Sequence, residues 1–140
     1  SSLLFQLQIP DDSVMVRCDA QQISQLLTNL LQNAINALEV FYSLEESAAD
    51  PTSSAKISLT LETRGANILL VVEDNGPGFP TEGREHLTEP YFTTHTKGTG
   101  LGLAIVAKIV EDHQGRLELG DSSLGGAKVT IELPISQKND

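Results

Sequence analysis

The feature that most constrains this chain is a glycine-rich segment that leads directly into an apolar helical pattern. Glycines occupy the alternating positions 98, 100 and 102, and Leu103, Ile105 and Val106 follow them. A glycine lets a ligand approach the backbone closely, and the first turn of a helix presents unpaired N–H groups and the positive end of its dipole. Together these properties favour an anion site, most often for phosphate. A glycine-rich hairpin or an ordinary helix start would show the same pattern, so other motifs have to decide.

A long helix is expected from residue 19 to about residue 40. Asp19 suits the N-cap, Gln22 stands in the capping-box position, and apolar residues recur at helical spacing from 23 to 38.

Three asparagines share one face of this helix, because Asn29, Asn33 and Asn36 are spaced at i, i+4 and i+7. Asparagine is a middling-to-poor helix former, so three aligned copies lower the stability of the helix. Carboxamide oxygens suit a hard cation such as Mg²⁺, which usually keeps several waters and substrate phosphate oxygens as ligands. On this pattern alone, a cation site and a solvated polar face are both open.

A carboxylate, Asp74, stands at the end of the continuous apolar run 68–72, and the turn Gly76-Pro77-Gly78 follows it. The run predicts a strand buried on both faces, where an unpaired charge is costly. One interpretation is that Asp74 accepts a hydrogen bond from the exocyclic amino group of a bound base. Gly76 and Gly78 would then let the base lie against the backbone. The alternative is an Asx-type turn at a strand end.

The remaining segments complete one domain with a core of about residues 3–134. Residues 43–55 are polar and contain proline and serine, which predicts a surface loop. Residues 81–88 suggest a short irregular helix, residues 89–99 a lid anchored by Tyr91 or Phe92, and residues 135–140 a tail. Apolar patterns predict strands at 5–9, 14–18, 57–61, 68–72, 117–119 and 129–133, and a second helix at 103–110 ended by Gly115.

Composition excludes several classes of function. The net charge of −10 argues against a general nucleic-acid surface, which needs clustered Lys and Arg. Cys18 is the single cysteine, so no internal disulfide or cysteine-cluster metal site can form. No run approaches the roughly 20 apolar residues that span a bilayer, so membrane contact by this domain is not expected. The chain begins with Ser1, and we expect a fragment of a longer protein.

Three motifs stand in a fixed order, namely an Asn-rich helix (29–34), an Asp-x-Gly-x-Gly turn (74–78) and a Gly-x-Gly-x-Gly helix start (98–103), with Glu89-Pro90-Tyr91-Phe92-Thr93-Thr94 between the last two. This order closely resembles the N, G1, F and G2 boxes of the catalytic ATP-binding domain of bacterial sensor histidine kinases. The likeness covers about residues 3–134. The sequence at residues 92–94 and 97–99 is most similar to that of nitrogen-regulation-type sensor kinases.

The resemblance implies a Bergerat α/β two-layer sandwich, with a mixed, mostly antiparallel sheet and helices on one face. It implies ATP and Mg²⁺, with Asn33 holding the metal, Asn29 near the phosphates and Asp74 on the adenine amino group. Asn29 and Asn33 are the expected catalytic residues. The nucleotide-binding residues implied by the four boxes are Asn29, Asn33, Asn36, Asp74, Gly76, Gly78, Phe92, Thr93, Thr94, Lys97, Gly98, Thr99, Gly100, Leu101, Gly102 and Leu103.

Two positions depart from the family pattern. Asn36 stands where many members have a phosphate-contacting Lys or Arg, so Lys97, Arg84 or His95 are candidates to supply that charge. Ala127 occupies the place of a frequent Thr near the adenine, which leaves that second base contact open.

The partners also follow from the resemblance. The family carries its phosphoacceptor histidine on a preceding dimerisation helix, whose pattern is absent here, so His86, His95 and His113 are expected to be surface or lid residues. The implied partners are a histidine-bearing dimerisation domain of the same parent protein and, indirectly, a response regulator. The domain itself is expected to be cytoplasmic and monomeric, although its parent could be membrane-anchored.

Two other functions compete with this one. ATPases of the same fold, such as gyrase, chaperone and mismatch-repair ATPases, place a water-activating Glu where this chain has Asn29, and a carboxamide is no general base. The third function is a module that only binds a partner protein, against which Asn33, Asp74 and the glycines argue.

Overall fold

The computed structural model describes residues 3–9, 19–44, 55–80, 82, 86–88 and 102–134. Five strands and two helices account for most of these residues. In chain order they are β1 (Leu3–Gln8), α1 (Ala20–Leu44), β2 (Ala55–Arg64), β3 (Asn67–Asp74), α2 (Gly102–Asp112), β4 (Arg116–Asp121) and β5 (Ala127–Pro134).

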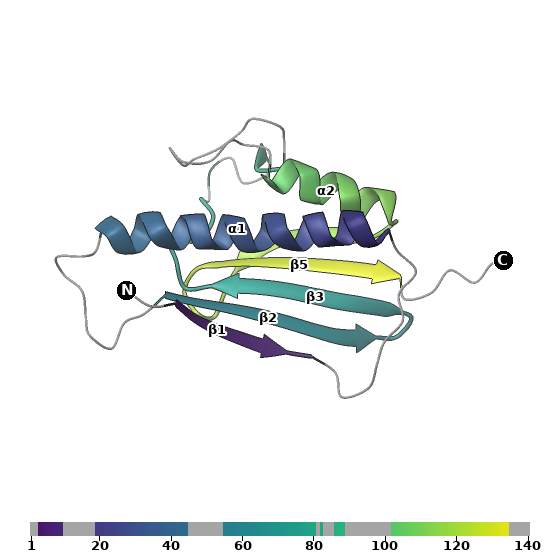
Figure 1. Ribbon diagram of the computed structural model, residues 1–140, viewed down its shortest axis with the longest axis horizontal. Coiled ribbons are helices and arrows are strands. Elements are labelled where there is room, and N and C mark those ends of the chain that lie inside the picture. The colour runs from purple at the N-terminus through teal and green to yellow at the C-terminus, as the bar shows by residue number, and fades with distance from the viewer. Residues whose placement is uncertain are drawn as a thin grey trace.

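The strands form one mixed sheet in the order β1-β2-β3-β5-β4. β1 runs parallel to β2, and the other three pairs are antiparallel. Both helices lie over the same face of the sheet, so the domain has two layers (Figure 1). The expected α/β sandwich with a mostly antiparallel sheet and helices on one face is confirmed.

The core lies between the helices and the three central strands. On β3 the inward side chains are Ile68, Leu70 and Val72, and α1 contributes every third or fourth residue from Leu26 to Leu38. Leu69 and Val71 point to the opposite face and are still only 6% and 7% exposed. β3 is therefore buried on both faces, as its continuous apolar run predicts.

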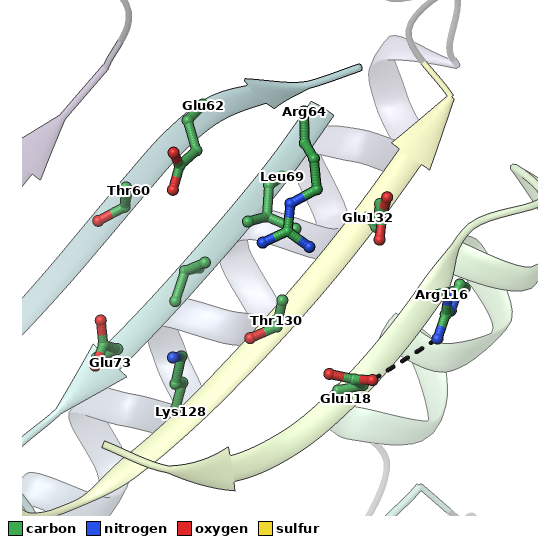
Figure 2. A pocket seen from close by; sticks show the side chains of 11 residues that line it. Thr60, Glu62, Arg64, Leu69, Glu73, Arg116, Glu118, Lys128, Thr130 and Glu132 are labelled. Atoms are coloured by element: carbon green, nitrogen blue, oxygen red, sulfur yellow. Dashed lines mark ion pairs between the residues drawn. The ribbon is translucent and has the colours of Figure 1, made fainter. Parts of the chain in front are cut away.

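The sheet face away from the helices is polar around this apolar centre. Charged and hydroxyl side chains of β2, β3, β4 and β5 surround Leu69 and Val71 there and line a hollow of about 480 Å³ (Figure 2).

Helix α1 begins as its sequence predicts, because Asp19 caps it. Asp19 Oδ1 accepts from the backbone N–H groups of Gln21 and Gln22 at 3.0 and 3.1 Å. The helix continues to Leu44, beyond the expected end near residue 40. The predicted loop 43–55 is therefore wrong at both ends, because residues 43 and 44 are helical and residue 55 begins β2.

The end of α2 differs from the expected glycine cap. Gln114, at φ 61°, is the left-handed residue, and its N–H donates to Glu111 O at 3.0 Å. The N–H of Gly115 donates to Val110 O at 2.8 Å, which completes a Schellman motif with Gln114 at C′. Gly115 is required for space instead, since a Cβ there would lie 2.5 Å from Glu132 O and from Leu133 Cδ2.

Several sequence predictions fall outside the described residues: the strand at 14–18, the lid at 89–99, the tail at 135–140, and half of the irregular helix at 81–88. Within the described part of the chain, no helix combines the length and apolarity needed to cross a membrane.

The cap of α2 yields a stability prediction. Replacing Gln114 with Gly removes the steric penalty of a left-handed L-residue, so Gln114→Gly should raise the free energy of unfolding by about 0.5–1 kcal/mol. Urea denaturation measures the change, and Gln114→Ala, which keeps the penalty, serves as the control. A glycine variant no more stable than the alanine variant would contradict the strained cap.

Candidate functional site

Asp74 ends β3 as a buried carboxylate with only one of its oxygens occupied. The residue is 4% exposed. Its Oδ1 accepts from the Gly76 N–H at 2.9 Å and from the Ala127 N–H at 3.1 Å. Among the described residues no donor reaches Oδ2, which therefore remains able to accept a hydrogen bond from a ligand.

The surroundings of Asp74 change the pKa of its carboxyl group. Burial raises the pKa of this carboxyl above its usual 3.8, and the N–H groups of Gly76 and Ala127 oppose that rise only in part. Since the folded-state pKa lies above the unfolded value, ionised Asp74 costs folding stability. That cost is absent below pH 3.8 and is complete above the raised pKa. A donor placed at Oδ2 would favour the ionised form.

Glycines pack closely around Asp74. A Cβ at Gly126 would overlap the carboxylate of Asp74 and would lie 2.6 Å from the Gly76 nitrogen. Gly78 has φ 81°, and its own Cβ position is 3.5 Å from the Gly126 carbonyl carbon. The absence of side chains on these residues lets the two segments pack closely against each other and against Asp74.

A second cluster joins α1 to the first residue of α2. A Cβ on Gly102 would lie 2.8 Å from Asn33 Oδ1 and 3.2 Å from Asn33 Nδ2. The Asn33 carboxamide therefore lies directly against the N-terminus of α2, where unpaired N–H groups and the helix dipole favour an anion.

The other two asparagines of this face have different surroundings. Asn29 Nδ2 is buried and has no hydrogen-bond partner among the described residues, an arrangement that costs about 1–3 kcal/mol unless a ligand accepts from it. Asn36 Oδ1 accepts from Gln32 Nε2 at 3.0 Å, so its oxygen is engaged within α1.

Helix α1 connects the two clusters. A Cβ on Gly76 would lie 3.3 Å from Leu38 Cδ2 and 3.9 Å from the carbonyl carbon of Ala37. Ala37 follows Asn33 by one helical turn, or about 6 Å along the axis. The Asp74 end and the Gly102 end therefore both contact α1, about one helical turn apart.

The remaining predicted site residues are placed less fully. Leu103 is partly buried and packs against the core. Phe92, Thr93, Thr94, Lys97, Gly98, Thr99, Gly100 and Leu101 lie outside the described residues, as do the candidate cations Arg84 and His95.

Sequence reasoning missed the contribution of Gly126 and of the Ala127 backbone. Glycines 125 and 126 are adjacent in the sequence, but only the strand order β3-β5-β4 brings them to Asp74.

The described histidines agree with a structural or surface role. His113 Nε2 accepts from the Asp19 N–H at 3.2 Å, and its Nδ1 lies 2.9 Å from Ile109 O. It therefore ties the end of α2 to the start of α1. His86 is exposed.

Comparisons with known proteins agree with this site. The family described as "Histidine kinase-, DNA gyrase B-, and HSP90-like ATPase" matches residues 18–137. Nitrogen regulation protein NtrY of Azorhizobium caulinodans is 39% identical over 132 residues, which cover 94% of this chain and 16% of that protein. This chain therefore spans a small part of that relative's length.

Solved structures show the same fold. The nucleotide-free catalytic domain of histidine kinase ThkA has a TM-score of 0.77 at 33% identity, with 95% of this chain and 79% of that chain covered. ThkA in complex with response regulator protein TrrA has a TM-score of 0.72 at 29% identity, with 96% and 34% covered.

These findings bear out the four-box resemblance, including its nitrogen-regulation type. The chain belongs to the Histidine kinase-, DNA gyrase B-, and HSP90-like ATPase family, as an ATP-binding catalytic domain of the sensor histidine kinase kind.

Proposed function

We propose that this domain binds Mg²⁺·ATP along α1 and delivers the γ-phosphoryl group to a histidine on a separate dimerisation domain. The observation that carries the proposal is the carboxylate of Asp74, whose Oδ1 accepts from two backbone N–H groups while none of the described residues donates to Oδ2. A ligand that supplies a donor there would complete the hydrogen bonding of a carboxyl group that is only 4% exposed.

Asp74 selects the base. An ionised carboxylate at this position accepts from the exocyclic amino group of adenine. Guanine presents a carbonyl oxygen at the corresponding position, so two acceptors would face each other and leave a buried charge unpaired. The missing side chains at 76 and 126 let the chain pack against Asp74, so that the N–H groups of Gly76 and Ala127 reach Oδ1.

The Gly102 end suits the phosphates. The N-terminus of α2 faces the Asn33 carboxamide, and Asn29 offers a buried donor that lacks a partner among the described residues. This donor set fits a nucleotide phosphate and a hard cation, with Asn33 as the protein's oxygen ligand. When bound, Mg²⁺ neutralises charge on the transferring phosphoryl group.

The site lacks a general base at the position that decides between transfer and hydrolysis. Asn29 cannot take a proton from water at ordinary pH, so its amide can orient a phosphate but not activate a nucleophile. An outside nucleophile is therefore required, and we assign a histidine of the dimerisation domain. ThkA is solved with a response regulator, which supports the same class of downstream partner for this chain.

The first test of this proposal is the substitution Asp74→Asn. The new carboxamide would have to present its one oxygen to the N–H groups of Gly76 and Ala127, which turns its N–H₂ toward the adenine amino group. ATP affinity should fall at least tenfold, or by about 1.4 kcal/mol or more, in calorimetric titration. The free energy of unfolding should not fall, because a desolvated charge is removed. ATP binding as tight as in the wild type would remove Asp74 from base recognition.

A second test follows the titration of Asp74 itself. Carbon NMR of the carboxyl should give a midpoint above pH 3.8 in the free domain, and ATP should lower that midpoint because it binds the ionised form. ATP affinity should therefore rise with pH through the raised pKa. A midpoint that ATP leaves unchanged would mean that no donor reaches Oδ2.

A third test uses the contact between Gly102 and Asn33. Gly102→Ala should displace the Asn33 carboxamide and weaken Mg²⁺·ATP binding about tenfold, as Asn33→Ala should, while metal-free ATP binding changes little. The double variant should bind no worse than the weaker single variant, since both remove the same interaction. Gly120→Ala is the matched control, because nothing lies within 4 Å of its added Cβ. Additive losses would show that Gly102 acts independently of Asn33.

A further inference from the structure

A buried serine next to the Asp74 site organises the turn between β4 and β5. Ser122 is 8% exposed, and its Oγ donates to Glu73 Oε1 at 2.8 Å. The same Oγ accepts from the Leu124 N–H at 2.9 Å. Backbone bonds from Ser122 N to Gly126 O and from Gly125 N to Ser122 O, at 2.8 and 3.0 Å, close the turn. The hydroxyl of Ser122 thus makes one hydrogen bond within the turn and one to β3.

The Ser122–Glu73 bond holds the turn from the side opposite to Asp74. Successive residues of a strand point to opposite faces, so Glu73 lies on the outer face of the sheet and Asp74 on the helix face. Because β5 lies between β3 and β4, the bond spans the first residues of β5. Asp74 takes the Ala127 N–H at the same point. The start of β5 is therefore fixed by adjacent β3 residues on both faces.

Glu73 keeps this bond although a cation stands nearby. Its register partner on β5 is Lys128, and Figure 2 places both side chains at one end of the outer face. Within the described residues no ion pair joins them, and the carboxylate of Glu73 is bonded to the Ser122 hydroxyl. A role limited to surface charge would not require the buried hydroxyl.

We infer that Ser122 and Glu73 are positioning residues for adenine recognition, which hold the Ala127 N–H on Asp74 Oδ1 and so keep Oδ2 free for the base. This inference rests on the proposed function. Without the bond, the turn can withdraw the Ala127 N–H. Asp74 would then lose one of the two donors that fix the orientation of its carboxylate. The loss of this donor would also disfavour the ionised form of Asp74.

The test compares four variants with one control. Ser122→Ala and Glu73→Ala remove the bond, and each should weaken ATP binding about threefold to tenfold in calorimetric titration. Ser122→Thr keeps the hydroxyl and Glu73→Gln keeps the acceptor oxygen, so both should bind ATP as the wild type does. Ser123→Ala, an exposed neighbour in the same turn, is the matched control. Wild-type affinity in both alanine variants would overturn the inference.

Two further measurements separate positioning from a general loss of structure. In the Asp74→Asn background, Ser122→Ala should cause no additional loss of ATP affinity, whereas a merely structural defect would add its own loss. In the free domain, Ser122→Ala should raise the carboxyl titration midpoint of Asp74 measured by carbon NMR. An unchanged midpoint overturns the inference without reference to nucleotide, while a wild-type domain that fails to bind ATP overturns the proposed function instead. If Ser122→Ala does not fold, Glu73→Ala supplies the same readouts.

Discussion

The buried carboxylate of Asp74 is the interaction on which the site depends. Its burial raises its pKa, and the backbone N–H groups of Gly76 and Ala127 make that burial tolerable at one oxygen only. Those donors come from two segments that are far apart in sequence and adjacent in the sheet. Gly126 has to lack a side chain for the two to meet, since a Cβ would overlap the carboxylate. The end of the sheet is therefore arranged around one charge that a ligand can complete.

Helix α1 contacts both the Gly76 turn beside Asp74 and the start of α2. Its buried face from Leu26 to Leu38 fixes the helix on the sheet. Asn33 then lies against Gly102, and Leu38 lies against Gly76. One helix therefore does both things: one face of α1 packs in the core, and other residues of α1 contact Gly76 and Gly102. Glycines at these contacts let the elements approach α1 closely.

Local patterns in the sequence predicted the elements that have strong local causes. The apolar period of α1, its Asp19 cap and the continuous run of β3 are all observed. The predicted end of α1 was wrong because no glycine or proline follows residue 40 directly to mark it. The cap at Gln114 was missed because a non-glycine residue rarely takes positive φ. Gly126 and Ser122 could not be assigned from the sequence, because their contacts with Asp74 and Glu73 depend on strand order rather than on spacing along the chain.

We propose that this site transfers the phosphoryl group of ATP to a histidine rather than to water. Incubating the domain with γ-labelled ATP, alone and with a fragment carrying the histidine-bearing dimerisation domain, tests it most directly. With Asn29 in place of a general base, the domain alone should release phosphate at close to the background rate. Adding the fragment should place an acid-labile, base-stable label on that fragment. Rapid phosphate release by the domain alone, abolished by substitution of Asn29, would contradict the claim and favour an ATPase.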